Sequence, residues 1–276
     1  MEKMIPVVRH LEDINNLSAF GRDGGIVEGQ DENIKRIANE IFSEINLIDN
    51  ETAFLVTSPR NRAVETAYAV KESLKKMSNE AVKIKVSVSE GLRENDQGRP
   101  ILPDNYNPGD DFEGFKVAGA IFVKETFGKD FGGSDNFLYR YADPVKCKDG
   151  SYMYPELKTY FSERGDSYRD VLVRVYDSVL SFADRMNNVS DKVKVVVVTH
   201  SQIIQILRDL NDVANDISKG LVSYEMGTLP RLCWEAYKRR HKRLAAGSVE
   251  MMTVETLNDS NFIEILKKER DHLSSL

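Results

Sequence analysis

The sequence is poor in cysteine and in long apolar runs, and it has no excess of positive charge. Its two cysteines, Cys147 and Cys233, cannot build a disulfide framework and lack metal-site spacing, which favours a reducing compartment. The longest apolar stretches, residues 117–123 and 193–198, are far too short to cross a bilayer. The 38 lysines and arginines are outnumbered by 44 aspartates and glutamates, for a net charge of −6, which argues against a protein that coats nucleic acid. We therefore expect a soluble, cytoplasmic protein with no membrane and no nucleic acid among its partners.

The 276 residues are enough for a continuous hydrophobic core, and their apolar pattern alternates between strand and helix. Strands are expected at residues 5–8, 53–56, 82–88, 193–198 and 248–254. Helices are expected at residues 31–47, 167–186, 203–213 and 261–273, with a further helix that ends near Met77. Ser58 is expected to cap that further helix, with Pro59 at its first position. The alternation predicts an α/β fold, a three-layer sandwich in which helices cover both faces of a mostly parallel central sheet.

The segment from residue 99 to 164 interrupts this alternation. It is rich in glycine, proline, aspartate, asparagine and aromatic residues, and it has one helical stretch near residues 115–127. We interpret it as an insertion between two core elements. The expected organisation is therefore a single domain over residues 1–276, with residues 99–164 folded over the sheet edge as a lid.

Polar and charged residues follow the expected strands at the points where ligands bind in open α/β sheets. The first strand leads into Arg9 and His10, and the buried strand at residues 193–198 leads into His200. Arg62 lies at the start of a helix, and Glu94 follows the third strand. Guanidinium groups pair with phosphate oxygens, and the free N–H groups of a helix start face negative charge. The sequence therefore predicts a phosphate-type oxyanion site at this edge.

Four segments resemble, in the right order, motifs of the histidine phosphatase (phosphoglycerate mutase-like) superfamily. They are residues 7–13 (Val-Val-Arg-His-Leu-Glu-Asp) with Asn16 after them, residues 57–67 (Thr-Ser-Pro-Arg-Asn-Arg-Ala-Val-Glu-Thr-Ala), residues 92–98 (Leu-Arg-Glu-Asn-Asp-Gln-Gly) and residues 196–200 (Val-Val-Val-Thr-His). The resemblance covers nearly the whole chain apart from the lid and the last helix. It departs from the family pattern at Leu11, where glycine is usual, and at Ser201-Gln202, which replaces a Gly-Gly-like pair.

The resemblance implies a phosphatase that hydrolyses a small phosphorylated metabolite through a phosphohistidine intermediate. His10 would be the nucleophile, and Glu94 would give a proton to the leaving oxygen and later take one from water. The phosphoryl oxygens would be held by Arg9, Arg62 and His200.

Further implications concern the substrate, the cofactors and the assembly. The substrate would also be bound by Asn16, Gly21 and Ser201. No metal and no other cofactor is expected, because arginines and imidazole take over the role of the cation. The sequence leaves the oligomeric state open, with a homodimer as one option.

Several assignments have alternatives. His10 alone could be a core histidine that ends a strand, and its pairing with His200 on another strand is what favours catalysis. Arg60 competes with Arg62, which the family pattern favours because it directly precedes an alanine. The acid has three other candidates, Glu90, Asp96 and Glu113.

Two other functions are weighed against the phosphatase. The first is a phosphoglycerate-type phosphomutase, whose insertion carries an adjacent arginine pair that grips the substrate carboxylate. Here Arg140 in the expected lid has no adjacent arginine, which favours hydrolysis. The second is a non-catalytic module that binds a phosphorylated ligand, and the departures at Leu11 and Gln202 are its motivation.

Overall fold

The computed structural model describes residues 4–11, 25–48, 51–94, 99–100, 145–146, 152–153, 161–163, 168–187, 193–240, 244–253 and 259–275. The chain divides into two compact units. The first unit comprises Met1–Ile14, Asp23–Glu94 and Leu172–Leu276. The second comprises Asn15–Arg22 and Asn95–Val171.

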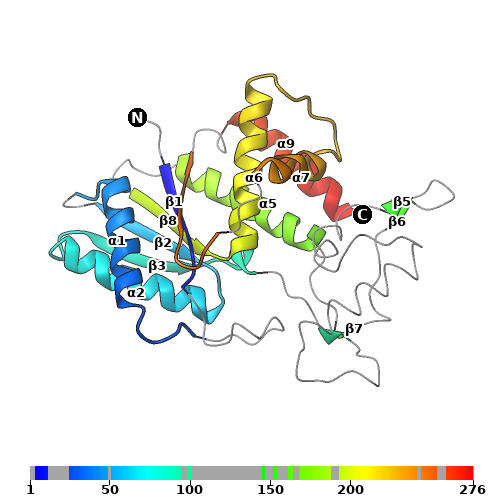
Figure 1. The fold of residues 1–276 in the computed structure, drawn as a ribbon. Helices are drawn as coiled ribbons and strands as arrows, with labels where there is room; N and C mark the ends of the chain where they lie inside the picture. The colour runs from blue at the N-terminus through cyan, green and yellow to red at the C-terminus, as the bar shows by residue number, and fades with distance from the viewer. Residues whose placement is uncertain are drawn as a thin grey trace. The chain divides into compact units, whose positions relative to one another are not determined.

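The first unit is built on a five-stranded sheet in the order β3-β2-β8-β1-β9 (Figure 1). Its strands are β1 (Met4–Arg9), β2 (Thr52–Thr57), β3 (Lys83–Val88), β8 (Val193–Thr199) and β9 (Val249–Thr253). The pairs β1–β8, β2–β8 and β2–β3 are parallel, and β9 alone runs antiparallel, beside β1. The predicted mostly parallel sheet is confirmed, and all five predicted strands form within two residues of their expected bounds.

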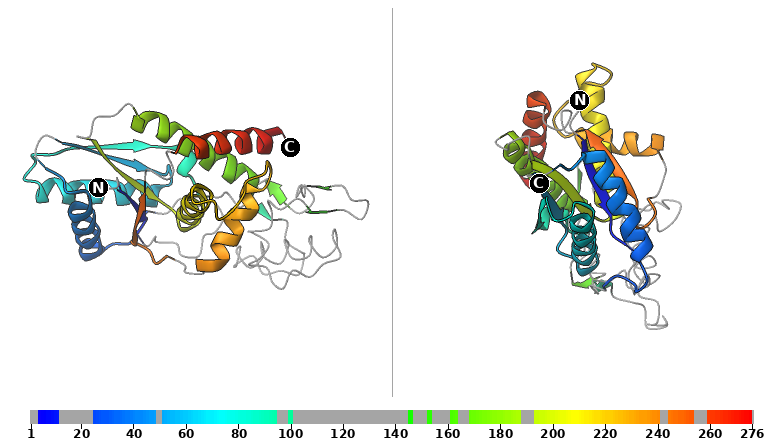
Figure 2. Two further views of the ribbon diagram at one scale, coloured as in Figure 1. Left: turned by 90° about the horizontal axis from the view of Figure 1, so that it is seen from above. Right: turned by 90° about the vertical axis from the view of Figure 1, so that its left-hand side faces the viewer.

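Helices cover both faces of this sheet. They are α1 (Asp31–Ile45), α2 (Asn61–Met77), α5 (Tyr168–Asn187, in the first unit from Leu172 on), α6 (Ser201–Ser218), α7 (Leu229–Arg240) and α9 (Ser260–Ser275). Figure 2 shows α1 and α2 on one face and α5 on the other. The central strands β1 and β8 are apolar on both faces, since the adjacent residues Val7 and Val8 and the adjacent residues Val196 and Val197 are all at most 9% exposed. The predicted three-layer α/β sandwich is therefore confirmed.

The core on the α1 and α2 face explains why these helices form where they do. In α1 the buried residues Ile37, Ala38, Ile41 and Ile45 recur at helical spacing and so make one apolar stripe. This stripe joins a cluster that includes α2 residues and strand residues such as Leu55. Burial of apolar surface contributes about 25 cal/mol per Å² and fixes the helices against the sheet.

The start of α2 differs from the prediction. Its N-cap residue is Arg60 and the helix begins at Asn61, so the expectation of a Ser58 cap followed by Pro59 was wrong. The Arg60 carbonyl accepts the first helical hydrogen bonds, from the backbone of Ala63 and Val64. Ser58 is engaged elsewhere: its backbone N–H donates to the Val198 carbonyl at 3.0 Å. This hydrogen bond continues the pairing of β2 with β8 by one residue and holds Ser58 outside the helix.

Two further helical features differ from expectation. Helix α6 extends beyond the predicted residues 203–213 at both ends, and helix α7 was not predicted. Both have strongly buried faces, which in α7 consist of Leu229, Leu232, Cys233 and Ala236.

In the second unit the structure describes four short strands and the start of α5. The strands are β4 (Arg99–Pro100), β5 (Val145–Lys146), β6 (Tyr152–Met153) and β7 (Phe161–Glu163), which form the antiparallel pairs β4–β7 and β5–β6. The helical stretch expected at residues 115–127 lies outside the described residues. The lid over residues 99–164 stays a prediction.

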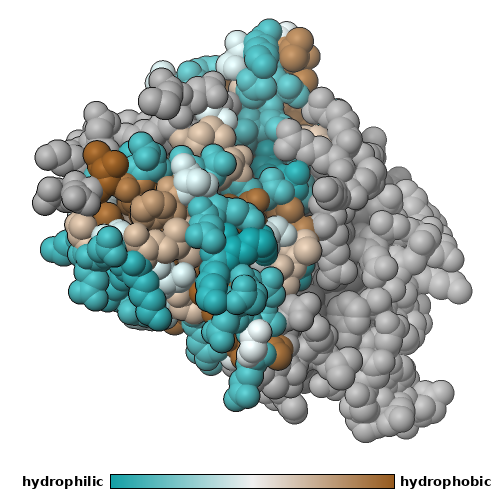
Figure 3. All heavy atoms as spheres, turned by 60° about the vertical axis from the view of Figure 1, so that its left-hand side comes forward, coloured by the Kyte–Doolittle hydropathy of each residue, from teal (hydrophilic) through white to brown (hydrophobic). Residues whose placement is uncertain are grey.

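The surface of the described part carries few large apolar side chains. Those exposed by roughly half or more are Ile48, Tyr68, Val88, Leu221 and Met226. Figure 3 shows one face on which hydrophilic residues predominate, with a smaller apolar region among them. None of the helices that the structure describes is both long and apolar enough for a membrane span.

Candidate active site

The carboxyl ends of three parallel strands meet at one edge of the sheet. The backbone N–H of His10, directly after β1, donates to the Thr199 carbonyl at 2.9 Å. The backbone N–H of Ser58, directly after β2, donates to the Val198 carbonyl at 3.0 Å. Both acceptors belong to the end of β8, and His200 follows immediately. The sheet register therefore brings the three predicted segments together.

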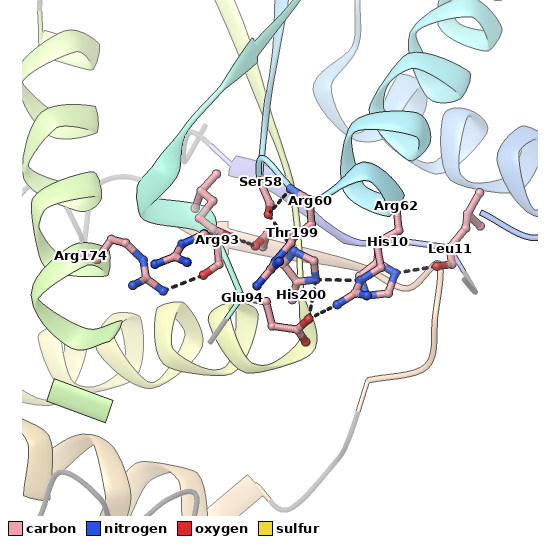
Figure 4. A network of polar contacts seen from close by, with 11 residues as sticks. His10, Leu11, Ser58, Arg60, Arg62, Arg93, Glu94, Arg174, Thr199 and His200 are labelled. Carbon is pink, nitrogen blue, oxygen red and sulfur yellow. Dashed lines mark hydrogen bonds and ion pairs between the residues drawn. The ribbon is translucent and has the colours of Figure 1, made fainter. Parts of the chain in front are cut away.

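His10 and His200, far apart in the sequence, lie side by side at this edge (Figure 4). Their ring centroids are 4.9 Å apart, and the rings are tilted by 55°. His200 is fully buried and His10 is 6% exposed. The predicted convergence of the two imidazoles is therefore present in the structure.

The proton of a neutral His10 ring is placed by a backbone carbonyl. His10 Nδ1 lies 2.6 Å from the Leu11 carbonyl oxygen, which can only accept, so Nδ1 carries the proton and Nε2 carries a lone pair. The backbone N–H of Leu11 donates to Thr66 Oγ1 at 3.1 Å, and that hydroxyl donates to the Arg62 carbonyl at 2.6 Å. Helix α2 thus anchors Leu11, the residue whose carbonyl orients the His10 ring.

The backbone and the surrounding core both allow leucine at position 11, where the family pattern has glycine. Positive φ among the described non-glycine residues occurs at Asn46, Asn79 and Glu80, so Leu11 does not need the conformational freedom of glycine. Its side chain is 1% exposed and belongs to the core beside α1 and α2. The carbonyl that orients His10 is present with either residue.

The surroundings of His10 keep its ring neutral. Burial, followed by the neighbouring His200 and Arg62, lowers the pKa of His10 from 6.5 to about 3. The Leu11 carbonyl and Glu94 act in the opposite direction and are weaker. A neutral ring with its proton on Nδ1 has a nucleophilic nitrogen at Nε2 across the physiological pH range.

Three charged or polar side chains form a triangle beside the two rings. Arg62 Nη2 donates to Glu94 Oε2, and Arg62 Nε donates to His200 Nδ1 at 3.4 Å. His200 Nδ1 lies 3.5 Å from the same Glu94 oxygen. The Arg62 side chain is 11% exposed and that of Glu94 is 32% exposed. An anionic oxygen thus already lies between a guanidinium and an imidazole.

Burial and three arginines act on the His200 ring. Burial first, then the charges of Arg62, Arg60 and Arg9, lowers the pKa of His200 well below its ordinary value. Arg9 Nη1 donates to the Leu244 carbonyl, so the structure places this guanidinium beside the 244–248 turn while its charge acts on His200. Arg60, the alternative to Arg62, also contributes through its charge. Arg62 contacts both Glu94 and His200.

The backbone that carries Glu94 is held from two sides. Thr199 Oγ1 donates to the Leu92 carbonyl at 2.8 Å, and Arg174 Nη2 of α5 donates to the Arg93 carbonyl at 3.0 Å (Figure 4). Neither of these two hydrogen bonds could be predicted from the spacing of residues in the sequence, because both depend on how separate elements pack.

Gly91 allows this backbone to approach α5 closely. A Cβ atom on Gly91 would lie 1.5 Å from Ser178 Oγ and 2.9 Å from the Arg174 carbonyl oxygen. Real Cβ atoms do not come so near, so a larger residue would displace the short 3₁₀ turn Glu90–Leu92 or the helix. Glycine at this position therefore helps to set where Glu94 lies.

Of the remaining predicted site residues, the structure describes only Ser201. Ser201 is half-buried and begins α6, whereas Asn16 and Gly21 lie outside the described residues. Among the alternatives to Glu94, Glu90 is 76% exposed on its side chain and lies 3.8 Å from Arg93, and Asp96 and Glu113 lie outside the described residues. Within the part of the chain that the structure describes, no group of three histidine, cysteine, aspartate or glutamate side chains could hold a metal ion.

The neutral state of His10 predicts how stability depends on pH. A histidine in the unfolded chain titrates near 6.5, whereas His10 in the folded protein titrates near 3. Below pH 6.5 the unfolded chain binds more protons, so His10 lowers the stability of the fold as the pH falls through this window. His10→Asn keeps an N–H donor for the Leu11 carbonyl but does not titrate. We expect this variant to lose less stability between pH 7 and pH 5 than the wild type, by up to about 2 kcal/mol in urea unfolding. Equal losses of stability in the two proteins would contradict a lowered pKa for His10.

Comparisons with known proteins give similarity only at the level of solved structures. No model of a protein family and no curated protein matches the sequence. A mycobacterial glucosyl-3-phosphoglycerate phosphatase is 14% identical, with a TM-score of 0.46 and coverage of 90% of this chain and 89% of that chain. A phosphoglycerate mutase from Bacillus anthracis is 15% identical, with a TM-score of 0.45 and coverage of 96% and 98%. A putative alpha-ribazole-5'-P phosphatase from Escherichia coli is 12% identical, with a TM-score of 0.46 and coverage of 91% and 90%.

Proposed function

We propose that this protein is a phosphatase that hydrolyses a small phosphate monoester through a phosphohistidine on His10. One observation carries the proposal: a neutral His10, whose proton is held on Nδ1, lies beside His200, Arg62 and Glu94 at the carboxyl edge of a parallel sheet. The arrangement supplies a nucleophile, a set of groups for an oxyanion and a carboxyl group for proton transfer.

The first step transfers the phosphoryl group to the enzyme. The lone pair of His10 Nε2 forms a bond to phosphorus, and the bond from phosphorus to the ester oxygen breaks. The Glu94 carboxylate takes up the proton that a monoanionic phosphate monoester carries and passes it to the departing oxygen, so that the alcohol leaves neutral. The Leu11 carbonyl, 2.6 Å from Nδ1, stabilises the ring as positive charge develops on it.

The second step releases phosphate. The Glu94 carboxylate takes a proton from water, the water oxygen bonds to phosphorus, and the N–P bond returns its electrons to His10 Nε2. Throughout, Arg62 and His200 face the phosphoryl oxygens and oppose the charge of the transition state. Each donor of this type supplies about 3–4 kcal/mol when removed singly.

A simple assay tests the proposal. The wild-type protein is incubated with an aryl phosphate in the presence of a chelator, and released phosphate is measured. Turnover that survives chelation supports the proposed chemistry, which uses no metal. A requirement for an added divalent cation would overturn it. No turnover over a broad panel of phosphate monoesters would favour a module that only binds a phosphorylated ligand.

A further inference from the structure

Ser58 contacts Nε2 of His200, whereas Arg62 and Glu94 lie beside Nδ1 of the same ring. Its side chain is fully buried, and Ser58 Oγ lies 2.8 Å from His200 Nε2 (Figure 4). The same oxygen accepts a hydrogen bond from the backbone N–H of Arg60 at 3.3 Å. With its backbone N–H bonded to the Val198 carbonyl, Ser58 is fixed relative to the strand that carries His200.

The contacts of His200 define where its proton lies in this structure. A guanidinium is always protonated, so Arg62 Nε donates and His200 Nδ1 accepts at 3.4 Å. A neutral His200 therefore carries its proton on Nε2, from which it donates to Ser58 Oγ. In this state the ring offers only a lone pair on the side of Arg62 and Glu94.

That state does not suit a bound phosphate. A phosphoryl oxygen accepts hydrogen bonds, so it needs an N–H on His200 Nδ1, where a Glu94 oxygen already lies at 3.5 Å. A second proton on the ring is opposed by its burial and by the charges of Arg9, Arg60 and Arg62. The remaining way to present an N–H is to move the single proton from Nε2 to Nδ1.

We infer that Ser58 is a positioning residue whose hydroxyl allows His200 to exchange one tautomer for the other when a phosphate-type anion binds. The inference rests on the proposed function, since this anion is the phosphoryl group of the proposed substrate. Exchange with water moves the single ring proton: water takes the proton from Nε2 and water supplies one to Nδ1, so the charge of the ring is unchanged. A hydroxyl has one proton and two lone pairs, so Ser58 accepts from Nε2 in the first state and donates to it in the second.

Nitrogen NMR of the imidazole rings tests the exchange directly. The protein has four histidines, so the His200 signals can be assigned by comparison with His200→Gln. Without ligand, we expect the proton on Nε2. Saturation with inorganic phosphate is expected to move it to Nδ1. A His200 ring that keeps its proton on Nε2 with phosphate bound, or that becomes doubly protonated, would overturn the inference.

Variants of Ser58 supply a second test. Ser58→Ala leaves Nε2 without a partner that can both accept and donate, so we expect kcat/KM for an aryl phosphate to fall about 10- to 100-fold. Ser58→Thr keeps the hydroxyl and is expected to recover most of this loss. Thr57→Val is the matched control, because it removes a neighbouring buried hydroxyl that donates to the Ser58 carbonyl at 3.2 Å and not to His200. The thermal unfolding of each variant shows whether it is folded.

The outcomes separate this inference from the proposed function. If the wild-type protein neither binds inorganic phosphate nor hydrolyses an aryl phosphate, the proposed function fails. If it does both, while folded Ser58→Ala keeps full kcat/KM and the His200 proton stays on Nε2, the role of Ser58 fails alone. A loss in Ser58→Ala that Ser58→Thr does not recover, with both variants folded, also contradicts the role of the hydroxyl.

Discussion

Replacing His10 with alanine is expected to lower the turnover of an aryl phosphate at least about 10⁴-fold, because the reaction loses its nucleophile. His10→Asn should be equally inactive. Asparagine can still donate to the Leu11 carbonyl as Nδ1 does, but it has no basic nitrogen in place of Nε2. Steady-state kinetics with the purified variants measure the effect.

The control for this prediction is His272→Ala on α9, which changes a histidine outside the site. We expect its turnover to stay within about threefold of the wild type, as for substitutions that touch no part of the machinery. A His10→Asn protein that keeps more than a tenth of the wild-type turnover would show that another residue attacks phosphorus.

Replacing Glu94 with glutamine is expected to have two opposite effects. The turnover of an aryl phosphate should fall about 10²- to 10⁴-fold, because glutamine cannot move a proton to or from the reacting oxygens. The affinity for inorganic phosphate should rise about tenfold, equivalent to about 1.4 kcal/mol. The Glu94 carboxylate accepts from Arg62 and lies 3.5 Å from His200 Nδ1, so it competes with an incoming phosphate for both groups. Glutamine is neutral and competes less.

The matched control is Glu90→Gln, which changes a nearby exposed carboxylate that pairs with Arg93. Its kinetics and phosphate inhibition should equal those of the wild type. Phosphate affinity that falls in Glu94→Gln would mean that Glu94 assists phosphate binding rather than competing with it. Loss of turnover in Glu90→Gln instead of Glu94→Gln would reassign the acid.

The arrangement of the sheet could be predicted because its central strands are apolar on both faces. Residues 195–198 of β8 form an unbroken run of valines, which is typical of a parallel strand covered by helices on either side. Once the strands are parallel, their carboxyl ends share one edge. The meeting of His10 and His200 follows from this topology together with the short distance from each strand end to its histidine.

The details of the hydrogen bonding could not be predicted in the same way. Ser58 carries the signal of a helix cap in sequence, yet its backbone bonds to the end of β8 and its hydroxyl contacts His200. Thr66 and Thr199 reach backbone carbonyls of other segments, and no local pattern marks such partners. These contacts depend on the register between elements that are distant in the chain.

Helix α7 was missed although its sequence contains a helical pattern. Its buried residues Leu229, Leu232, Cys233 and Ala236 recur at spacings of three, four and seven. The helix ends in the basic residues Lys238, Arg239 and Arg240, which are typical of a solvated segment. The apolar periodicity is the stronger signal, since it is what packs the helix against α6.

The most direct test of the central claim is to trap the phosphoenzyme. The protein is mixed rapidly with a radiolabelled phosphate monoester, quenched in base, digested and mapped by mass spectrometry. We predict an acid-labile, base-stable phosphoryl group on His10, bonded to Nε2, that is absent from His10→Asn. Phosphate release without any such intermediate, or a phosphoryl group on a different residue, would contradict the account.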